Sequence, residues 1–485
     1  MKETWQERLR QVVVRRPQGR TFAAFNLNVD VVARVTQEAV RRLASDEHGI
    51  DWKRVAATDV ESLRAVRSRE DFLAVLRRGF REGKSALLVR EDEALVDWWR
   101  GVFTERVESM GGQAGIIANQ MAALGAASVV YSPLLSPRQA SFFLDGVTWP
   151  VVEDGRVRYV PAVSAGRPAD MTREPWVFEY GKGERFAFPD ETFVTPRANR
   201  AIITTGVQGP ERRFHADVHG GLAALGADLD VGFLAGYHQC GERPDDPQAV
   251  MAYIEQSCAD LALLASRNPR LKLHVEYVPA KARELEAAIY RRLGQAIHSF
   301  GINEAEIRAL LRRFGYEQIA SELEERERAY LLYQGGLALL RELGVERVHV
   351  HNLGYYVVIL RKPYGRSAAH VRDACVYASA VNARKAQVGG FVAAADLALV
   401  RDLPFSDVGF EQLQAFAAEI RQAPPAGVSA EAIERFPAEG ILEADDHWVI
   451  VTPSHIVPNP VGTVGMGDTI SSSAYFFEVC GTVAG

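Results

Sequence analysis

The stretch TVGMGDTISSS, from Thr463 to Ser473, decides how the rest of the chain is interpreted. Gly465 and Gly467 leave the backbone free to approach a ligand, and Asp468 precedes several hydroxyl residues where a helix would begin. Backbone N–H groups converge on negative charge at a helix N-terminus, and the helix dipole adds about half a positive charge there. The stretch therefore predicts an anion-binding turn that opens a helix.

Asp468 in this turn has two interpretations. It is a helix N-cap, since Asp is among the best capping residues. Alternatively, it is a general base that takes the proton from an attacking hydroxyl while the N–H groups of the turn stabilise a transferred phosphoryl group. The local sequence leaves both interpretations open.

Composition bounds the class of protein. With 485 residues, 47% of them hydrophobic, the chain can bury a large core, and its size predicts one large domain carrying a smaller one. The net charge of −6 indicates neither a nucleic-acid partner nor an anionic membrane. The four cysteines are scattered without metal-ligand spacing, and no run reaches the ~20 apolar residues of a membrane span. We expect a soluble, cytoplasmic protein with reduced thiols.

The segment FAAFNLNVDVVARV, from Phe22 to Val35, predicts a buried strand interrupted by Asn26, Asn28 and Asp30. Alternation along the strand places these three side chains on one face. Polar groups there need partners, and the hydroxyls of a sugar are suitable ones. Turn-capping roles remain the alternative.

Further along, SMGGQAGIIANQMAALGAASVVY runs from a double glycine into a helix and then a strand. Gly111, Gly112 and Gly115 allow a ligand to approach the backbone, as in ligand-contacting turns of α/β sheets. Tight helix packing would explain the same glycines. The motif therefore marks either a ligand contact or a packing site.

From residue 204 onward, strand-like and helix-like patterns alternate, which predicts a doubly wound α/β sheet. LKLHVEYVP places His274 and Glu276 on one face of a strand. SFGINEAEIRALL places Asn303 and Glu306 at the mouth of a helix, where they also form a capping-box pattern. Carboxylate oxygens at such positions suit Mg²⁺, which is shared with substrate phosphates.

The motif GMGDTISSSAYFFE resembles the GxGD signature of sugar kinases with a ribokinase-like fold, and most of all the ADP-dependent glucokinases and phosphofructokinases. NxNxD, GGQAG, HxE and NxxE precede it in the order of that family, over nearly the whole chain. The resemblance implies a doubly wound large domain with a smaller β-rich lid. We expect the lid segments at approximately 28–60 and 146–200, and helical scaffold between residues 37 and 108.

The resemblance also implies the reaction: a hexose or hexose phosphate is phosphorylated by ADP, which leaves as AMP. Asp468 would be the catalytic base in the turn of Gly465 and Gly467. The expected sugar contacts are Asn26, Asn28, Asp30, Gly112, Gln113 and Gly115, with Asn119 as a weaker candidate.

The same resemblance assigns the nucleotide and metal sites. Arg200 and Arg197 would reach the phosphates of ADP, with ordinary surface arginines as the alternative. His351 and Tyr356 would contact the base, although an aromatic strand is also typical of a core. Glu276 and Glu306 would act on Mg²⁺ through water, oriented by Asn303. His274 would belong to this network or be a satisfied core histidine.

The acceptor sugar depends on the lid. Glucose-specific members place a Glu in the segment that reads SREDFLAVL here, and Glu70 or Asp71 would serve. Basic residues in the same region favour the dianionic fructose 6-phosphate instead; they are Arg67, Arg69, Lys182 and Arg185. A glucokinase, a bifunctional enzyme, an ATP-dependent ribokinase-type enzyme and a non-catalytic sugar or nucleotide sensor remain alternatives. The sequence does not determine the oligomeric state.

Overall fold

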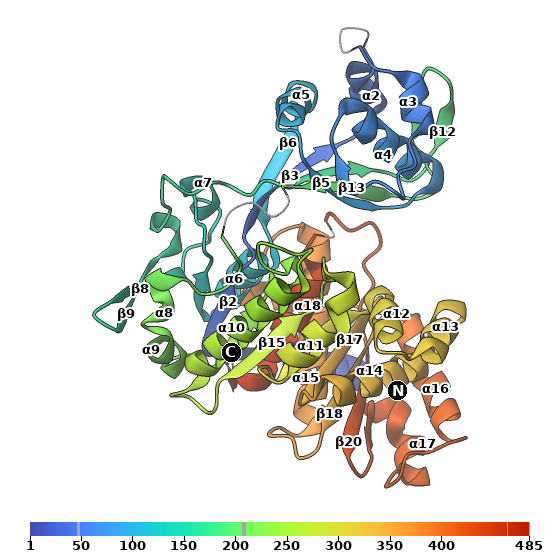
Figure 1. Cartoon of the computed structure of the whole chain (residues 1–485). Helices are drawn as coiled ribbons and strands as arrows, with labels where there is room; N and C mark the ends of the chain where they lie inside the picture. Colours follow the sequence, from blue (N-terminus) through green and yellow to red (C-terminus); the bar gives the residue numbers. More distant parts are fainter. Residues whose placement is uncertain (46–48, 206–209, 463, 485) are drawn as a thin grey trace.

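The computed structural model describes residues 1–45, 49–205, 210–462 and 464–484. They form a large domain with a smaller domain above it (Figure 1). Each domain is built on a sheet of its own. The small domain is blue with green strands in Figure 1, because two segments far apart in the sequence combine in it.

The large domain contains, in the described residues, an eleven-stranded sheet with the order β19-β20-β18-β17-β16-β15-β14-β2-β7-β8-β9. In this order, every pair of neighbouring strands between β17 and β8 is parallel. The pairs β8–β9, β17–β18, β18–β20 and β19–β20 are antiparallel. This architecture confirms the doubly wound α/β fold. The strands are β2 (Arg20–Ala24), β7 (Ala127–Tyr131), β8 (Val147–Glu153), β9 (Arg156–Pro161), β14 (Val231–Leu234), β15 (Lys272–Glu276), β16 (Ser299–Asn303), β17 (Arg347–Asn352), β18 (Tyr355–Arg361), β19 (Ile441–Glu443) and β20 (His447–Pro453).

Helices cover both faces of this sheet (Figure 1). One layer consists of α1 (Lys2–Val12), α6 (Gln113–Ala123), α15 (Ala368–Val388) and α18 (Met466–Val479). The other includes α9 (Leu222–Ala227), α10 (Pro247–Ala265), α11 (Glu286–Gly294), α12 (Glu304–Arg313), α13 (Glu317–Glu325), α14 (Ala329–Leu343), α16 (Asp407–Ile420) and α17 (Ala430–Glu439). Because helices cover both faces, β17 and β18 are buried almost throughout instead of alternating.

The small domain has a six-stranded sheet in the described residues, with the order β4-β5-β13-β10-β3-β6. Its strands are β3 (Asn28–Arg34), β4 (Ala65–Val66), β5 (Ala86–Arg90), β6 (Arg106–Gly111), β10 (Trp176–Tyr180) and β13 (Asn199–Thr204). Its helices are α2 (Gln37–Leu43), α3 (Trp52–Ala57), α4 (Arg69–Glu82) and α5 (Ala94–Val102). Aromatic rings fill the space between sheet and helices, with Phe72 4.6 Å from Phe178 and 5.0 Å from Trp99 between ring centroids. The domain therefore has a core of its own.

The structure differs from the expected lid boundaries in two places. The segment 147–161 forms β8 and β9, and β8 pairs with β7 of the large sheet, so this part does not belong to the lid. Conversely, residues 61–111 supply three strands and two helices to the small domain, where only scaffold was expected. Short strand-like segments do not reveal which sheet they join, because strand pairing is non-local.

The predicted strand from Phe22 to Val35 is two strands in two sheets. β2 ends at Ala24 in the large sheet, and β3 begins at Asn28 in the small one. The intervening backbone is anchored by the large domain, since Phe25 N donates to Ala235 O at 2.8 Å. The polar motif therefore lies at the junction of the domains.

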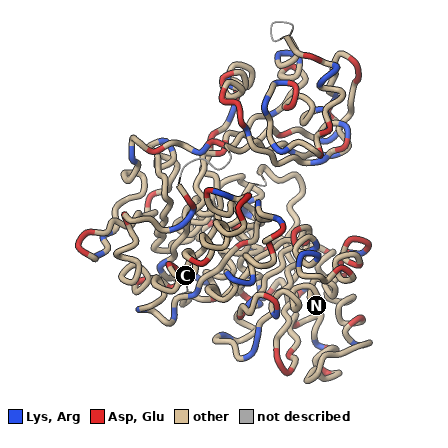
Figure 2. Tube along the Cα trace, in the orientation of Figure 1, with Lys and Arg blue, Asp and Glu red and all other residues tan. Residues whose placement is uncertain are grey.

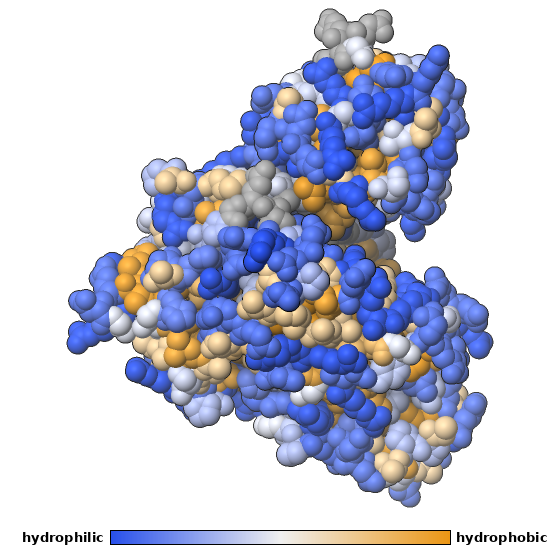
Figure 3. Space-filling model, viewed as in Figure 1, coloured by the Kyte–Doolittle hydropathy of each residue, from blue (hydrophilic) through white to orange (hydrophobic). Residues whose placement is uncertain are grey.

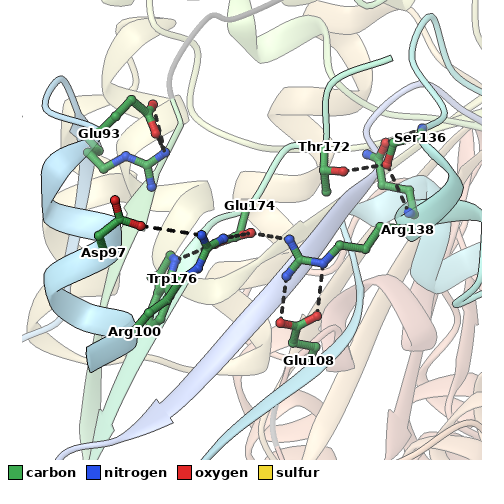
Figure 4. A network of polar contacts seen from close by, with 11 residues as sticks. Glu93, Asp97, Arg100, Glu108, Ser136, Arg138, Thr172, Glu174 and Trp176 are labelled. Atoms are coloured by element: carbon green, nitrogen blue, oxygen red, sulfur yellow. Dashed lines mark hydrogen bonds and ion pairs between the residues drawn. The ribbon is translucent and has the colours of Figure 1, made fainter. Parts of the chain in front are cut away.

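A network of ion pairs spans this junction (Figure 4). Arg138, on the short helix α7 (Pro137–Ala140) of the large domain, contacts Glu108 of β6 at 2.7 Å and also pairs with Glu174. Glu174 further accepts from Arg100 Nη2 at 3.1 Å and from Trp176 Nε1 at 2.9 Å. These contacts hold the chain at residue 174, where it re-enters the small domain.

Basic and acidic residues are interspersed along the chain in both domains (Figure 2). Figure 3 shows an open notch between the domains on the right of the view. In the described ranges, no helix has both the length and the apolar character that crossing a bilayer requires.

Candidate active site

The turn before α18 lies against two other elements of the large domain. Gly465 is the N-cap with φ +66°, a conformation that favours glycine, and a Cβ there would be 2.7 Å from the Ile116 side chain of α6. A Cβ on Gly467 would be 3.0 Å from the His351 ring. Close packing against protein groups therefore explains both glycines in this structure. Asp468 stands three residues after the cap, so it is not the N-cap itself.

The carboxyl group of Asp468 is partly buried among polar side chains. Burial, followed by the charge of Glu276, raises its pKa to about 6, and a hydrogen bond from Gln113 with the charges of His351 and Lys385 opposes this rise. At pH 7 the group is still largely ionised. Its surroundings are thus suited to accepting a proton near neutral pH.

Asp30 approaches the same point from the small domain. It is buried on β3, and a Cβ on Gly111 would be 2.0 Å from Asp30 Oδ1. Burial and the charge of Asp468 raise the pKa of Asp30 to about 7, while Arg200 lowers it. The structure therefore brings together Asp30, Asp468 and Arg200 from β3, α18 and β13. Asn28 pairs with Gly111 in the β3–β6 ladder.

The residues of the GGQAG segment have different surroundings in the structure. Gly112 has φ +74°, and a Cβ there would be 2.4 Å from Asn26 O. Gln113, which starts α6, reaches Asp468. A Cβ on Gly115 would be 2.3 Å from the Met110 sulfur, so Gly115 serves helix packing in the structure. The weaker candidate Asn119 bonds backbone atoms of residues 142 and 144, which is a structural role.

Glu276, at the end of β15, is held by two histidines. His351 Nε2 lies 2.6 Å from Glu276 Oε1, and His274 Nε2 lies 3.3 Å from Oε2. Burial would raise the pKa of Glu276, but the two histidines outweigh it and lower the pKa to about 2. Burial would lower the pKa of His351, but the charge of Glu276 outweighs it and raises that pKa. The Nε2 of His351, expected at the base of the nucleotide, is thus engaged by Glu276.

Glu306 and Asn303 form the capping box that the sequence allowed. Asn303 Oδ1 accepts from Glu306 N at 2.8 Å, and Glu306 Oε2 accepts from Asn303 N at 3.2 Å. Burial and the charge of Glu276 raise the pKa of Glu306 to about 8. In the described part of the chain, no three His, Cys, Asp or Glu side chains converge closely enough to hold a metal directly.

A cavity of about 470 Å³ lies beside the start of α18. Its wall is largely apolar, with Leu353, Ile456 and Ile470, and it includes Tyr356 and part of His351. The Tyr356 ring is itself buried, 5.5 Å from the ring of His349 between centroids. This cavity has the dimensions and lining of a site for a planar aromatic ligand.

The two candidate arginines have different surroundings. Arg200 lies close enough to Asp30 to lower its pKa. Arg197 is exposed, and its Nε donates to Gly83 O at 2.7 Å at the end of α4. The structure therefore places Arg200 near Asp30, whereas Arg197 is bonded to the backbone at the end of α4.

The charged lid residues that were expected to select the acceptor have two kinds of surroundings. Lys182 and Arg185 are exposed around the hairpin of β11 (Arg185–Ala187) and β12 (Thr192–Val194). The other four contact partners within the small domain: Arg67 with Glu91, Arg69 with the ring of Trp98, Glu70 with Asp51 N and Asp71 with Arg54. Their charges are therefore used inside the small domain.

Sequence reasoning missed a group of basic side chains at the carboxyl ends of β14 and β15. Arg173 and Arg212 are buried, with 1% and 5% of their surface exposed, and burial followed by Arg212 lowers the pKa of Arg173 to about 9. Burial and Arg212 also lower the pKa of Lys281 to about 8. Arg173 O accepts from Val29 N at 2.9 Å, which places the backbone at Arg173 against β3. The three residues are far apart in sequence, so no local motif marks them.

Lys385 was also missed. It lies on α15, is 5% exposed, and its charge acts on Asp468. Burial lowers the pKa of Lys385, whereas Asp468 raises it. A lysine within the apolar helical run around ASAVNARKAQ was the available signal.

Comparison with known proteins provides an independent line of evidence. Residues 19–477 match the conserved region described as ADP-specific phosphofructokinase/glucokinase. The chain is 32% identical over 462 residues to the ADP-specific phosphofructokinase of Methanosarcina acetivorans, covering 94% of this chain and 92% of that protein. It is 27% identical to the ADP-dependent glucose/glucosamine kinase of Pyrococcus abyssi, covering 94% and 93%.

A solved structure described as an ADP-dependent kinase complex with fructose 6-phosphate and ADPβS superposes with a TM-score of 0.81 at 27% identity, covering 99% of this chain and 97% of the other. A phosphofructokinase from Pyrococcus horikoshii with AMP gives 0.78 at 26% identity, covering 96% and 98%. The likeness extends over both domains.

Proposed function

Because this chain belongs to the ADP-specific phosphofructokinase/glucokinase family of sugar kinases, we propose that it transfers the β-phosphoryl group of ADP to fructose 6-phosphate. The products are AMP and fructose 1,6-bisphosphate. The observation that carries the choice of acceptor is the buried basic group of Arg173, Arg212 and Lys281, of which Arg173 is bonded to β3 through its backbone.

A sugar phosphate brings a dianion into the site, and arginine and lysine are the side chains that meet it. Burial strengthens such contacts, because water competes less for the phosphate. The neighbouring Glu174 is fixed by Arg138, Arg100 and Trp176, which holds the backbone that carries Arg173. The backbone at Arg173 is thereby held beside β3.

The acceptor hydroxyls are recognised at the junction of the two domains. Asp30 and Asn28 present carboxylate and amide groups from β3, and Asn26 precedes them. Gln113 and the backbone at Gly112 complete this side of the site, whereas Gly115 supports it through packing. Hydrogen-bonding groups in this number suit a polyhydroxylated ring.

Asp468 acts as the general base. It accepts the proton of the acceptor hydroxyl as that oxygen bonds to the β-phosphorus, and the bond from phosphorus to the bridging oxygen of AMP breaks. The N–H groups in the first turn of α18 stabilise the charge on the transferred group. Lys385, which acts on Asp468, adds positive charge beside it.

ADP occupies the side of the site near α18 and β18. Its adenine fits the cavity of about 470 Å³ that Tyr356 and Leu353 help to line. We expect Arg200, whose charge acts on Asp30, to contact the phosphates, while Arg197 bonds Gly83 within the small domain. The backbone at Gly465 and Gly467 faces the diphosphate.

The residues present fit a divalent cation bound through water. The charge of Glu276 raises the pKa of both Glu306 and Asp468, so negative charge that a cation would neutralise is concentrated at this place. Mg²⁺, when bound, would screen the phosphate oxygens of ADP. Both oxygens of Glu276 already accept hydrogen bonds, so Glu276 and Glu306 would hold such an ion through water, with Asn303 orienting Glu306.

A screen of phosphoryl donors and acceptors tests the proposal. The purified protein is offered ADP or ATP separately, each with fructose 6-phosphate, glucose or glucosamine, and AMP formation is followed. We expect turnover with ADP and a higher kcat/KM for fructose 6-phosphate. A higher value for glucose would make it a glucokinase, comparable values a bifunctional enzyme, and binding without turnover a sensor.

We also place the enzyme in the cytoplasm, since its four cysteines, all in the described ranges, are buried and unpaired, as in reducing compartments.

A further inference from the structure

Beneath α18, one face of the large sheet carries polar side chains in register. His274, Ser299 and Arg347 are direct cross-strand partners on β15, β16 and β17. The Tyr475 ring of α18 covers the row, 5.5 Å from the His274 ring and 5.0 Å from the Arg347 guanidinium. All three side chains are buried, so water does not compete for their hydrogen bonds.

The next row on the same face contains the active-site carboxylate. Side chains two residues apart on a strand share a face, so Glu276 follows His274, and its partner across the ladder is Gly301. A Cβ on Gly301 would be 1.9 Å from Glu276 Oε2. The glycine thus leaves the space in which the Glu276 carboxylate lies against His274.

Hydrogen bonds join the two rows into one chain. Arg347 Nη1 lies 3.0 Å from Ser299 Oγ, Ser299 Oγ lies 2.9 Å from His274 Nδ1, and His274 Nε2 lies 3.3 Å from Glu276 Oε2. At its other end, Arg347 Nε donates to Glu478 Oε2 at 3.0 Å. The chain therefore runs from a buried ion pair to the active-site carboxylate.

The chemistry of the members gives this chain a direction. The ionised Glu276 carboxylate only accepts, so Nε2 of the neutral His274 ring carries the proton and Nδ1 accepts from the Ser299 hydroxyl, whose oxygen in turn accepts from the Arg347 guanidinium. Nδ1 is then the accepting nitrogen, and Nε2 carries the proton that is donated to Glu276. Glu276 itself needs no proton, because a carboxylate accepts at both oxygens.

We infer that Ser299 and Arg347 are positioning residues that fix the Nε2–H tautomer of His274 and so orient the Glu276 carboxylate in the active site. The inference rests on the proposed role of Glu276. Around that carboxylate lie His274 and His351 of the sheet, Glu306 of α12 and Asp468 of α18, and His349 is the next ring beyond His351. Of these, only His274 belongs to the directed chain, while His351 secures the second oxygen.

The tautomer is tested directly by nitrogen-15 NMR on protein labelled at histidine, with the His274 signals assigned by their loss in His274→Gln. We expect an accepting Nδ1 and a protonated Nε2 in the parent, and a mixture of tautomers in Ser299→Ala. A protonated Nδ1 in the parent would overturn the inference, whether or not any variant folds.

Kinetics provide the second readout. We expect Ser299→Ala to lower kcat about 10-fold, the lower range for loss of an outer-shell partner, with little change in KM for the sugar. Ser128→Ala is the matched control, because Ser128 is also a fully buried serine of the large sheet, bonded to Ala118 O at 2.8 Å. Thermal unfolding of both variants excludes a general loss of structure.

The proposed function and this inference fail in different ways. If Glu276→Gln lowers turnover but Ser299→Ala behaves like Ser128→Ala, the positioning chain is refuted and the function stands. If Glu276→Gln turns over normally, the role of Glu276 is wrong, and the tautomer measurement still decides whether the chain is directed as inferred.

Discussion

Two helices begin beside the carboxyl edge of the large sheet, and each carries a carboxylate three residues after its N-cap. In α12 the cap is Asn303, which exchanges hydrogen bonds with Glu306. In α18 the cap is Gly465, which has no side chain with which to accept from the first turn. One helix is therefore capped by its own side chains, and the other begins without a capping side chain.

The difference shows that helical position alone does not decide the role of a carboxylate. Glu306 and Asp468 share the residue class, the position and a raised pKa, about 8 and about 6, caused first by burial and then by Glu276. The two carboxylates differ in the residue at the N-cap of their helix. A capping side chain commits one oxygen of Glu306 to its own helix, whereas Asp468 shares its surroundings with Asp30, Gln113 and Lys385.

The largest expected effect is that of Asp468→Asn, which tests the helix that begins without a capping side chain. Loss of a general base lowers kcat by about 10²–10⁴-fold. We expect ADP binding, measured by calorimetry, to stay nearly unchanged. Asp407→Asn, in the first turn of α16 on the exposed surface, is the control and should turn over normally. Near-normal kcat in Asp468→Asn would remove the distinction between the two helices.

Arg173→Gln tests whether the buried basic group, and not the N-terminus of α12 or α18, binds the phosphate of the acceptor. A hydrogen bond to a charged group contributes about 1.5–3 kcal/mol, so KM for fructose 6-phosphate should rise about 10–100-fold. KM for ADP should not change. Arg197→Gln removes an exposed arginine bound to Gly83 O and serves as the control. Equal changes in both variants would count against the buried basic group.

Glu306→Gln tests the helix that is capped by its own side chains. The substitution removes charge from the proposed cation site but keeps an oxygen for the capping box, so we expect the Mg²⁺ concentration for half-maximal rate to rise about 10-fold. At saturating Mg²⁺, the loss in kcat should be smaller than in Asp468→Asn. A Mg²⁺ titration that overlays the parent would show that Glu306 is only a cap.

The smallest effect concerns stability against pH. The pKa of Glu306 is about 8 when folded and 4.5 ordinarily, so between these values the folded state binds more protons than the unfolded state. The free energy of unfolding should therefore fall as pH rises from about 5 to about 8. The free energy of unfolding, measured with urea at several pH values in this range, should depend less on pH in Glu306→Gln. If the free energy of unfolding falls with pH equally in the parent and in Glu306→Gln, other groups cause the loss of stability.

Local patterns in the sequence were enough for much of this molecule. Alternating strands and helices indicate the doubly wound sheet, and the structure has it. The glycine-rich turn indicates a helix after Gly465, and α18 begins at Met466. The spacing of Asn303 and Glu306 indicates a capping box, which is present. Each of these features depends on residues a few positions apart, so periodicity and capping chemistry reveal it.

What the sequence by itself determined is therefore the order of the elements and the residue types at their ends. Tertiary structure decided which groups meet: β8 joins the large sheet, His351 pairs with Glu276, and Arg173 gathers with Arg212 and Lys281. It also set the charge of the site, because burial and neighbouring carboxylates displace the pKa values of Asp30 and Asp468. Strand pairing and burial join residues separated by tens to hundreds of positions, and no local pattern encodes such contacts.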